Sequence, residues 1–168
     1  MLKAGEKMFA YSFEGYWKDV GTIQSLWEAN MDLLGEHPTF SLDDEKWRVY
    51  SRHAMFPPQF VGEGAKIVNS IISEGCEVYG TVENSILFGG VTVLPGAVVK
   101  DSVVMGGTVV GRGATLSYSL IDSNVEIGAG AKLGGEVRCE EGVTVIGDGT
   151  KIADGETVKP GAMIPDLR

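Results

Sequence analysis

The chain carries an internal repeat with a period of 17 residues, and this repeat constrains the fold more than any other feature. Three segments, 85–93, 102–110 and 119–127, align without gaps, and an earlier copy at 70–78 precedes the first of them by 15 residues. A fixed period of this length indicates stacked copies of one supersecondary unit. Such a unit cannot bury its apolar face alone, so neighbouring copies must pack against one another.

Within each copy, aliphatic residues recur at steps of six, six and five residues. They are Leu87, Val93, Val99, Val104, Val110, Leu116, Ile121, Ile127 and Leu133. A second small or branched residue follows each of them by four positions: Val91, Ala97, Val103, Thr108, Ala114, Leu120, Val125, Ala131 and Val137. Gly, Asn, Asp and Pro, which tolerate tight turns and positive φ, lie between them. The spacing predicts a mainly β chain that forms a left-handed parallel β-helix of hexapeptide repeats. Both residue sets would point inward, and one corner of each coil would be one residue shorter. An antiparallel sandwich of short strands is the alternative, and the constant phase of the repeat disfavours it.

The segment before the repeat follows other patterns. The aromatic-rich residues 8–17 alternate loosely and predict one or two strands. A tight turn at Asp19–Gly21 follows, and Thr22 is a suitable N-cap for a helix predicted over about 23–34, which Gly35 would end. Thirty-five residues cannot supply a sheet for the aromatic face. We therefore expect this unit either to dock on the coil or to be the tail of a further domain.

The remaining segments are less regular. A predicted linker over 36–59 contains a short acidic run, a predicted strand at Trp47–Ser51, and Pro57-Pro58, which excludes a helix there. After Leu133 the hexapeptide pattern loosens, and residues 143–162 predict either a last coil or a capping hairpin.

Composition excludes several classes of partner and site. The net charge of −9 argues against nucleic acid and against an anionic membrane surface, since both need a basic face. The two cysteines, Cys76 and Cys139, form no Cys-x-x-Cys pair, and Cys76 falls on a small inward position, which predicts a buried thiol. No apolar run approaches the length of a spanning helix, and residues 1–20 lack the apolar core of a signal peptide. We expect a cytoplasmic protein.

Two enzyme classes are common on hexapeptide coils. Acyltransferases use a His as general base, and carbonic-anhydrase-like proteins hold a metal with three His. The only histidines, His37 and His53, precede the coil, so the coil lacks the residue on which both enzyme classes depend. One serine stands at an equivalent position in each coil, and such a ladder indicates a structural stack rather than a set of nucleophiles. These serines are Ser70, Ser85, Ser102 and Ser119.

The segment Glu14–Thr22 contains more polar and charged side chains than a turn requires. A carboxylate at the end of a strand, before a glycine turn into a helix N-terminus, could hold a divalent metal or face a phosphate-bearing ligand. The alternative is that Asp19 only braces the turn.

Two motifs, Tyr-Trp-Lys-Asp-Val-Gly-Thr at 16–22 and Glu-Ala-Asn-Met-Asp-Leu-Leu at 28–34, resemble the end of the catalytic domain of bacterial glucose-1-phosphate adenylyltransferases (ADP-glucose pyrophosphorylases). Residues 47–51, 57–59 and 69–76 continue the resemblance, which covers nearly the whole chain. It implies an allosteric nucleotidyltransferase that binds ATP and glucose 1-phosphate and releases ADP-glucose and pyrophosphate for glycogen biosynthesis. It also implies a homotetramer and control by small phosphorylated effectors. The aspartate of the first motif, Asp19, is implied to help hold Mg²⁺.

The chain also departs from the family, because several of the family's motifs are missing. The nucleotide-binding loop Gly-Gly-x-Gly-x-Arg-Leu, the glucose 1-phosphate contacts and the second metal carboxylate are missing, so the chain contains no complete catalytic site and no assigned cofactor-binding residue. The resemblance therefore implies that residues 1–35 are the C-terminal remnant of an α/β nucleotidyltransferase domain. Residues 36–59 would be a linker and 60–168 a regulatory and oligomerisation β-helix, inactive as an isolated chain.

The resemblance does not carry over an effector. Enterobacterial members of the family have coil arginines that are implied to contact effector phosphate, and the matching region 87–93 has none. A hexapeptide-repeat acyltransferase and a free-standing structural assembly subunit remain the alternative functions.

Overall fold

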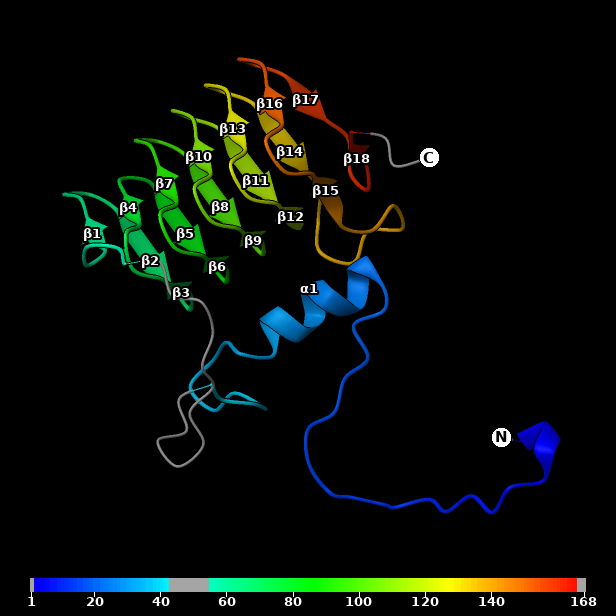
Figure 1. Cartoon of the computed structure of the whole chain (residues 1–168). Coiled ribbons are helices and arrows are strands. Elements are labelled where there is room, and N and C mark those ends of the chain that lie inside the picture. Colours follow the sequence, from blue (N-terminus) through cyan, green and yellow to red (C-terminus); the bar gives the residue numbers. More distant parts are fainter. Residues whose placement is uncertain (1, 43–54, 166–168) are drawn as a thin grey trace.

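The main body of the protein is a stack of β-coils. The computed structural model describes residues 2–42 and 55–165. From Phe60 onward each coil contributes one short strand to each of three sheets, and the strands pair in parallel with their equivalents in the adjacent coils (Figure 1). Val93, for example, pairs with Val110, which pairs with Ile127. The predicted parallel β-helix of hexapeptide repeats is confirmed.

Each sheet contains six of the described strands. The first sheet has the order β1 (Phe60–Val61), β4 (Glu77–Val78), β7 (Thr92–Val93), β10 (Val109–Val110), β13 (Glu126–Ile127) and β16 (Lys151–Ile152). The second has β2 (Lys66–Val68), β5 (Thr81–Glu83), β8 (Val98–Lys100), β11 (Thr115–Ser117), β14 (Lys132–Gly134) and β17 (Thr157–Val158). The third has β3 (Ile71–Ile72), β6 (Ile86–Leu87), β9 (Val103–Val104), β12 (Ser119–Ile121), β15 (Thr144–Ile146) and β18 (Met163–Ile164).

The interior of the coils is the hydrophobic core. All the aliphatic residues that the six-six-five spacing selects are at most 3% exposed. The small inward positions of the six-residue hexads are buried too, and Cys76 lies among them as predicted. Burial raises the pKa of the Cys76 thiol, which keeps it neutral.

Three of the predicted inward residues do not point inward. Val103 and Leu120 belong to a separate apolar cluster outside the coil, and Val137 is exposed in an insertion between β14 and β15. The shortened corner explains the first two. With one residue fewer, the inward position moves from the fourth to the third residue after the bulky one, and the fully buried Ser102 and Ser119 occupy it.

The serines form a hydrogen-bonded ladder along this corner. The backbone N–H of Ser102 donates to Oγ of Ser85 at 3.1 Å, and that of Ser119 donates to Oγ of Ser102 at 3.2 Å. Each hydroxyl in turn donates to the carbonyl two residues earlier, as Ser102 does to Lys100 at 2.7 Å. Because donors and acceptors are both satisfied inside the stack, the predicted structural role of the serines is confirmed.

The end of the chain forms a last coil and not a capping hairpin. The strands β15 to β18 all pair in parallel with the preceding coil. The insertion 135–143, which precedes β15, accounts for the loss of the hexapeptide pattern after Leu133.

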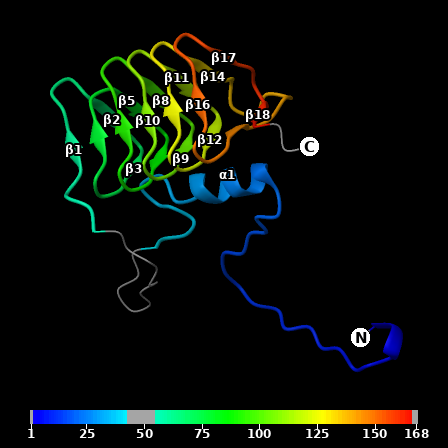
Figure 2. The ribbon, with the colours of Figure 1, turned by 45° about the horizontal axis from the view of Figure 1, so that its top comes forward.

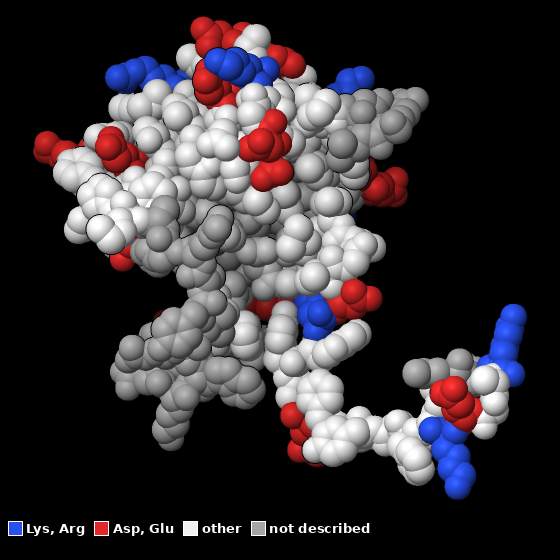
Figure 3. Space-filling model, in the orientation of Figure 1, with Lys and Arg blue, Asp and Glu red and all other residues white. Residues whose placement is uncertain are grey.

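The segment before the coil departs from prediction in one respect. A 3-10 helix spans Leu2–Ala4, and residues 8–17 contain no strand, so the predicted strands are wrong. A strand needs a neighbour to pair with, and these residues extend away from the coil with Phe9 91% and Tyr11 90% exposed (Figure 3). The predicted strand at Trp47–Ser51 lies outside the described residues.

The predicted helix is present and slightly shorter. It is α1 (Ile23–Met31), three residues short of the predicted end, and Asp32 is its C-cap. Thr22 is the N-cap as predicted: its Oγ1 accepts from the Ser25 N–H, and the Ser25 hydroxyl accepts from the Thr22 N–H, both at 3.1 Å. The helix lies along the stack, beside the third sheet (Figures 1 and 2). In the part of the chain that the structure describes, no helix has the length and apolar character to cross a bilayer.

Candidate functional site

The helix α1 docks on the coil through an aromatic pair. Trp27 is buried, and its ring meets the ring of Tyr118 edge-on, with 4.9 Å between centroids. The indole N–H of Trp27 donates to the carbonyl of Asp101 at 2.8 Å, and the hydroxyl of Tyr118 donates to Oε1 of Gln24 at 2.7 Å. The helix of this unit therefore docks on the coil, one of the two outcomes left open for it.

The outer face of the third sheet is apolar, which explains why the helix lies there. One apolar residue per coil stands just before the inward one, and register aligns them in a single row. The row consists of Ile71, Ile86, Val103, Leu120, Val145 and Met163. The equivalent positions of the other two sheets are mostly polar. Apolar doublets at one hexad in three are thus a sequence signal for the docking face that the six-residue spacing alone does not reveal.

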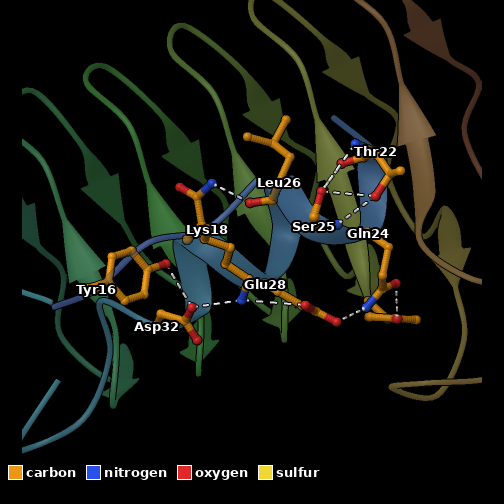
Figure 4. Close-up of polar contacts among 10 residues, drawn as sticks. Tyr16, Lys18, Thr22, Gln24, Ser25, Leu26, Glu28 and Asp32 are labelled. Carbon is orange, nitrogen blue, oxygen red and sulfur yellow. Dashed lines mark hydrogen bonds and ion pairs between the residues drawn. The ribbon is translucent and has the colours of Figure 1, made fainter. Parts of the chain in front are cut away.

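A polar network joins the helix to the motif segment that precedes it (Figure 4). The Lys18 ammonium donates to Oδ2 of Asp32 at 2.7 Å and lies 3.4 Å from Oε2 of Glu28. The hydroxyl of Tyr16 donates to the same Asp32 oxygen at 2.9 Å, and Nε2 of Gln24 donates to Oε1 of Glu28 at 2.9 Å. The two motifs of the sequence, 16–22 and 28–34, are therefore in direct contact.

This network shifts the ionisation of its members. The hydrogen bond to Asp32 raises the pKa of Lys18, and the hydrogen bond from Lys18 lowers the pKa of Asp32. The pKa of Glu28 is lowered, first by the hydrogen bond from Gln24 and then by Lys18. Desolvation, followed by the bond to Asp32, raises the pKa of Tyr16. At neutral pH the three charged side chains therefore stay ionised.

Asp19 occupies the turn that the sequence predicts. Its Oδ1 accepts a hydrogen bond from the Gly21 N–H at 3.0 Å, and the side chain is exposed. The carboxylate thus braces the turn, which fits one of the two roles left open for it. A hard oxygen donor on an exposed turn also suits Mg²⁺. Within residues 2–42 and 55–165, no group of three His, Cys, Asp or Glu side chains could hold a metal, so Asp19 can supply one ligand of such a site and not all of them.

Among the described residues, the remaining candidate features do not form a catalytic or metal-binding site. His37 is exposed, and His53 lies outside the described residues. A groove of about 590 Å³ on the coil is lined by charges of both signs, and two of them, Lys151 and Glu126, pair with each other at 2.9 Å.

Two family models match the chain in succession. The model described as nucleotidyl transferase matches residues 1–36, and the model described as GlmU-like, C-terminal hexapeptide matches residues 54–150. The first match contains the Asp19 turn and α1, and the second covers most of the coil. The order of the matches is therefore that of the two structural parts.

Three curated relatives that are similar to the chain carry the same name. A glucose-1-phosphate adenylyltransferase from Clostridium botulinum (strain Eklund 17B / Type B) is 57% identical over 100 residues, which cover 60% of this chain and 26% of the relative. One from Desulforamulus reducens is 55% identical over 60% of this chain and 25% of the relative. One from Bacillus mycoides is 54% identical over 59% of this chain and 26% of the relative.

The chain thus spans about a quarter of the length of these curated relatives. The hexapeptide match covers more than half of the chain, and the parallel coils show the same repeat in three dimensions. The chain belongs to the GlmU-like, C-terminal hexapeptide family.

Proposed function

We propose that this chain is the C-terminal regulatory and oligomerisation region of a glucose-1-phosphate adenylyltransferase, an enzyme that makes ADP-glucose and pyrophosphate from ATP and glucose 1-phosphate. The observation that carries the proposal is the succession of a nucleotidyl transferase match and a hexapeptide coil in one chain, together with the name of the relatives. The chain by itself is inactive in this proposal, because one carboxylate and a coil cannot bind and align two substrates.

Asp19 is the residue of this chain that we assign to Mg²⁺. Its carboxylate would supply one oxygen ligand, and the other ligands would come from protein outside the described residues, from substrate phosphates and from water. When bound, the metal would neutralise charge on the transferred nucleotidyl group. The chain's own contribution is to hold the carboxylate: Gly21 bonds its Oδ1, and the Thr22 cap fixes the start of α1 directly after it.

The remaining parts of the proposal concern assembly and regulation. A homo-oligomer, a tetramer in the complete enzyme, agrees with the exposed apolar residues of the first coil. Small phosphorylated effectors and a cytoplasmic location belong to the same proposal. No specific observation favours an acyltransferase, since the coil serines are committed to their ladder and the described coil contains no histidine. The match of residues 1–36 to the nucleotidyl transferase model favours the enzyme over a free-standing structural subunit.

The test starts from the source DNA upstream of the Met1 codon. An in-frame extension that encodes Gly-Gly-x-Gly-x-Arg-Leu is expected, and the complete protein should form ADP-glucose whereas residues 1–168 alone should not. Asp19→Asn in the complete protein should lower kcat by at least about 100-fold. Asp148→Asn, which removes a surface carboxylate bonded only to Asn124 among the described residues, is the matched control and should leave kcat unchanged. A stop codon just upstream of Met1, or a complete protein without adenylyltransferase activity, would refute the assignment.

A further inference from the structure

Tyr118 stands at a backbone position that does not suit a tyrosine. It has a φ of 48°, at the corner where the preceding coils place Asn69, Asn84 and Asp101 with φ between 43° and 48°. Asn and Asp tolerate this left-handed conformation, whereas a bulky side chain is uncommon there. Residues held in such conformations concentrate at functional sites, where the surrounding structure maintains them.

The three polar residues have a structural task that Tyr118 gives up. Nδ2 of Asn69 donates to Oδ1 of Asn84 at 2.8 Å, and Nδ2 of Asn84 donates to Oδ1 of Asp101 at 2.6 Å. The ladder ends at Asp101, whose carboxylate accepts a hydrogen bond and has none to donate to the next coil. Tyr118, the next residue of this corner, directs its ring and hydroxyl to the helix instead.

Those contacts all lie on α1. The Tyr118 ring packs against Trp27, and its hydroxyl donates to Gln24. The side-chain amide of Gln24 donates a hydrogen bond to Glu28, and the Glu28 carboxylate lies next to the Lys18 ammonium. The result is a continuous polar path from a buried residue of the coil to the residue directly before Asp19.

We propose that Tyr118 is a positioning residue for the Asp19 turn. The coil holds Gln24 through Tyr118, and Gln24 orients Glu28, which holds Lys18 together with Asp32. Lys18 fixes one end of the turn, and the Thr22 cap fixes the other. In this way the β-helix sets where the Asp19 carboxylate stands. The catalytic meaning of this arrangement rests on the proposed function, whereas the ordering of the turn can be measured in this chain alone.

Two backbone amides report the state of the turn. The Gly21 N–H donates to Asp19 and is protected while the turn is formed, and the Thr22 N–H donates to Ser25 and is protected while the cap at the end of the turn is formed. Tyr118→Phe keeps the ring against Trp27 and removes the hydroxyl. Losing one hydrogen bond should speed hydrogen exchange at Gly21 and Thr22 by roughly fivefold, with the coil amides unchanged. Tyr79→Phe, which removes a tyrosine hydroxyl bonded to Glu77 on the first sheet, is the matched control and should change neither amide.

A double-mutant comparison separates positioning from a general loss of stability. Lys18→Met cuts the path next to the turn, so Tyr118→Phe should add almost nothing to the exchange rates once Lys18 is replaced. Unchanged exchange in Tyr118→Phe, or the full fivefold increase on top of Lys18→Met, would overturn the proposal.

The complete enzyme supplies a second readout. Tyr118→Phe should raise the Mg²⁺ concentration for half-maximal activity by roughly fivefold and leave kcat at saturating Mg²⁺ nearly unchanged, while Tyr79→Phe should alter neither. If the complete protein lacks adenylyltransferase activity, the proposed function fails and the amide exchange still decides whether Tyr118 orders the turn. If activity is present and Mg²⁺ dependence is unaltered in Tyr118→Phe, the positioning role fails and the proposed function stands.

Discussion

Ser102 shows how a single buried hydroxyl supports the coil. It accepts from the Ser119 N–H and donates to the Lys100 carbonyl, and its side chain is fully buried. Ser102→Ala leaves the buried Ser119 N–H without a partner and removes one of the two hydrogen bonds that the Lys100 carbonyl accepts, so it should lower the free energy of unfolding by about 2 kcal/mol. Ser70→Ala removes the same pair of bonds at the solvent-accessible end of the ladder and should cost less than half as much. Urea unfolding of both variants checks this, and equal losses would contradict the burial argument.

Two glycines of one corner are expected to respond differently to the same substitution. A Cβ on Gly111 would lie 2.4 Å from the Ile127 carbonyl oxygen, whereas a Cβ on Gly113 would meet nothing within 4 Å. Gly113→Ala should therefore cost only the strain of its φ of 64°, about 1–2 kcal/mol. Gly111→Ala forces adjacent coils apart and should lower the melting temperature far more. Thermal unfolding of the two variants measures the difference, and a Gly111→Ala protein as stable as Gly113→Ala would show that the coils adjust freely.

At this scale the sequence predicted the core well and the short corner poorly. The bulky inward residues follow from spacing alone, because each must fill the same interior position. Val103 and Leu120 were misplaced because dropping one residue from a hexad moves its inward position, and which position is lost depends on backbone geometry at Asp101 and Tyr118. The outward role of these residues is seen in their contact with α1.

The contact between α1 and the motif segment 16–22 should weaken at low pH. Lys18 lowers the pKa of Asp32, so this pair stabilises the contact above the unfolded value of about 3.8 and ceases to do so as pH falls through the lower folded pKa. The amide chemical shifts of residues 16–18 should therefore be constant from pH 7 to 5 and change below about pH 4. Asp32→Asn should shrink this acid transition without abolishing it, because Glu28 still faces Lys18 and is influenced by Arg138. Glu77→Gln, on the first sheet, should leave it intact, and an unaltered transition in Asp32→Asn would exclude the pair as its cause.

Before the coil, the predicted helix is present and the predicted strands over 8–17 are absent, and this difference has a physical reason. The helix carries its own signals, a cap at Thr22 and apolar spacing, and its backbone bonds are internal, so α1 could be predicted from local sequence. A strand needs a partner, and residues 8–17 have none among the described residues. The place where α1 docks was left open because the outward members of the apolar doublets, such as Val103 and Leu120, were assigned to inward positions.

At the scale of the whole molecule, repetition made the architecture predictable while the site was not. The same hexapeptide pattern recurs in successive coils, so an error at one corner leaves the fold unchanged. The Asp19 turn does not belong to the repeat, and its environment depends on α1 and, in our proposal, on Tyr118. Spacing could therefore suggest a carboxylate on a turn, and the path that holds it had to be seen in three dimensions.

The first coil leaves an apolar end that a second copy of the chain is expected to cover. Its strands β1, β2 and β3 are the terminal strands of their sheets, and Phe60, Val61, Val68 and Ile71 there are 39–52% exposed. Unpaired strand edges with apolar side chains are complemented by another strand edge, and in a pure sample only the same chain offers one. Residues 1–168 should therefore be larger than a monomer by light scattering at tens of micromolar. Val68→Lys with Ile71→Lys should return the monomer with the fold intact, whereas Val109→Lys, on the side of the stack, should not. A monomeric wild-type chain, or an oligomer that tolerates both lysines, would place any subunit contact elsewhere.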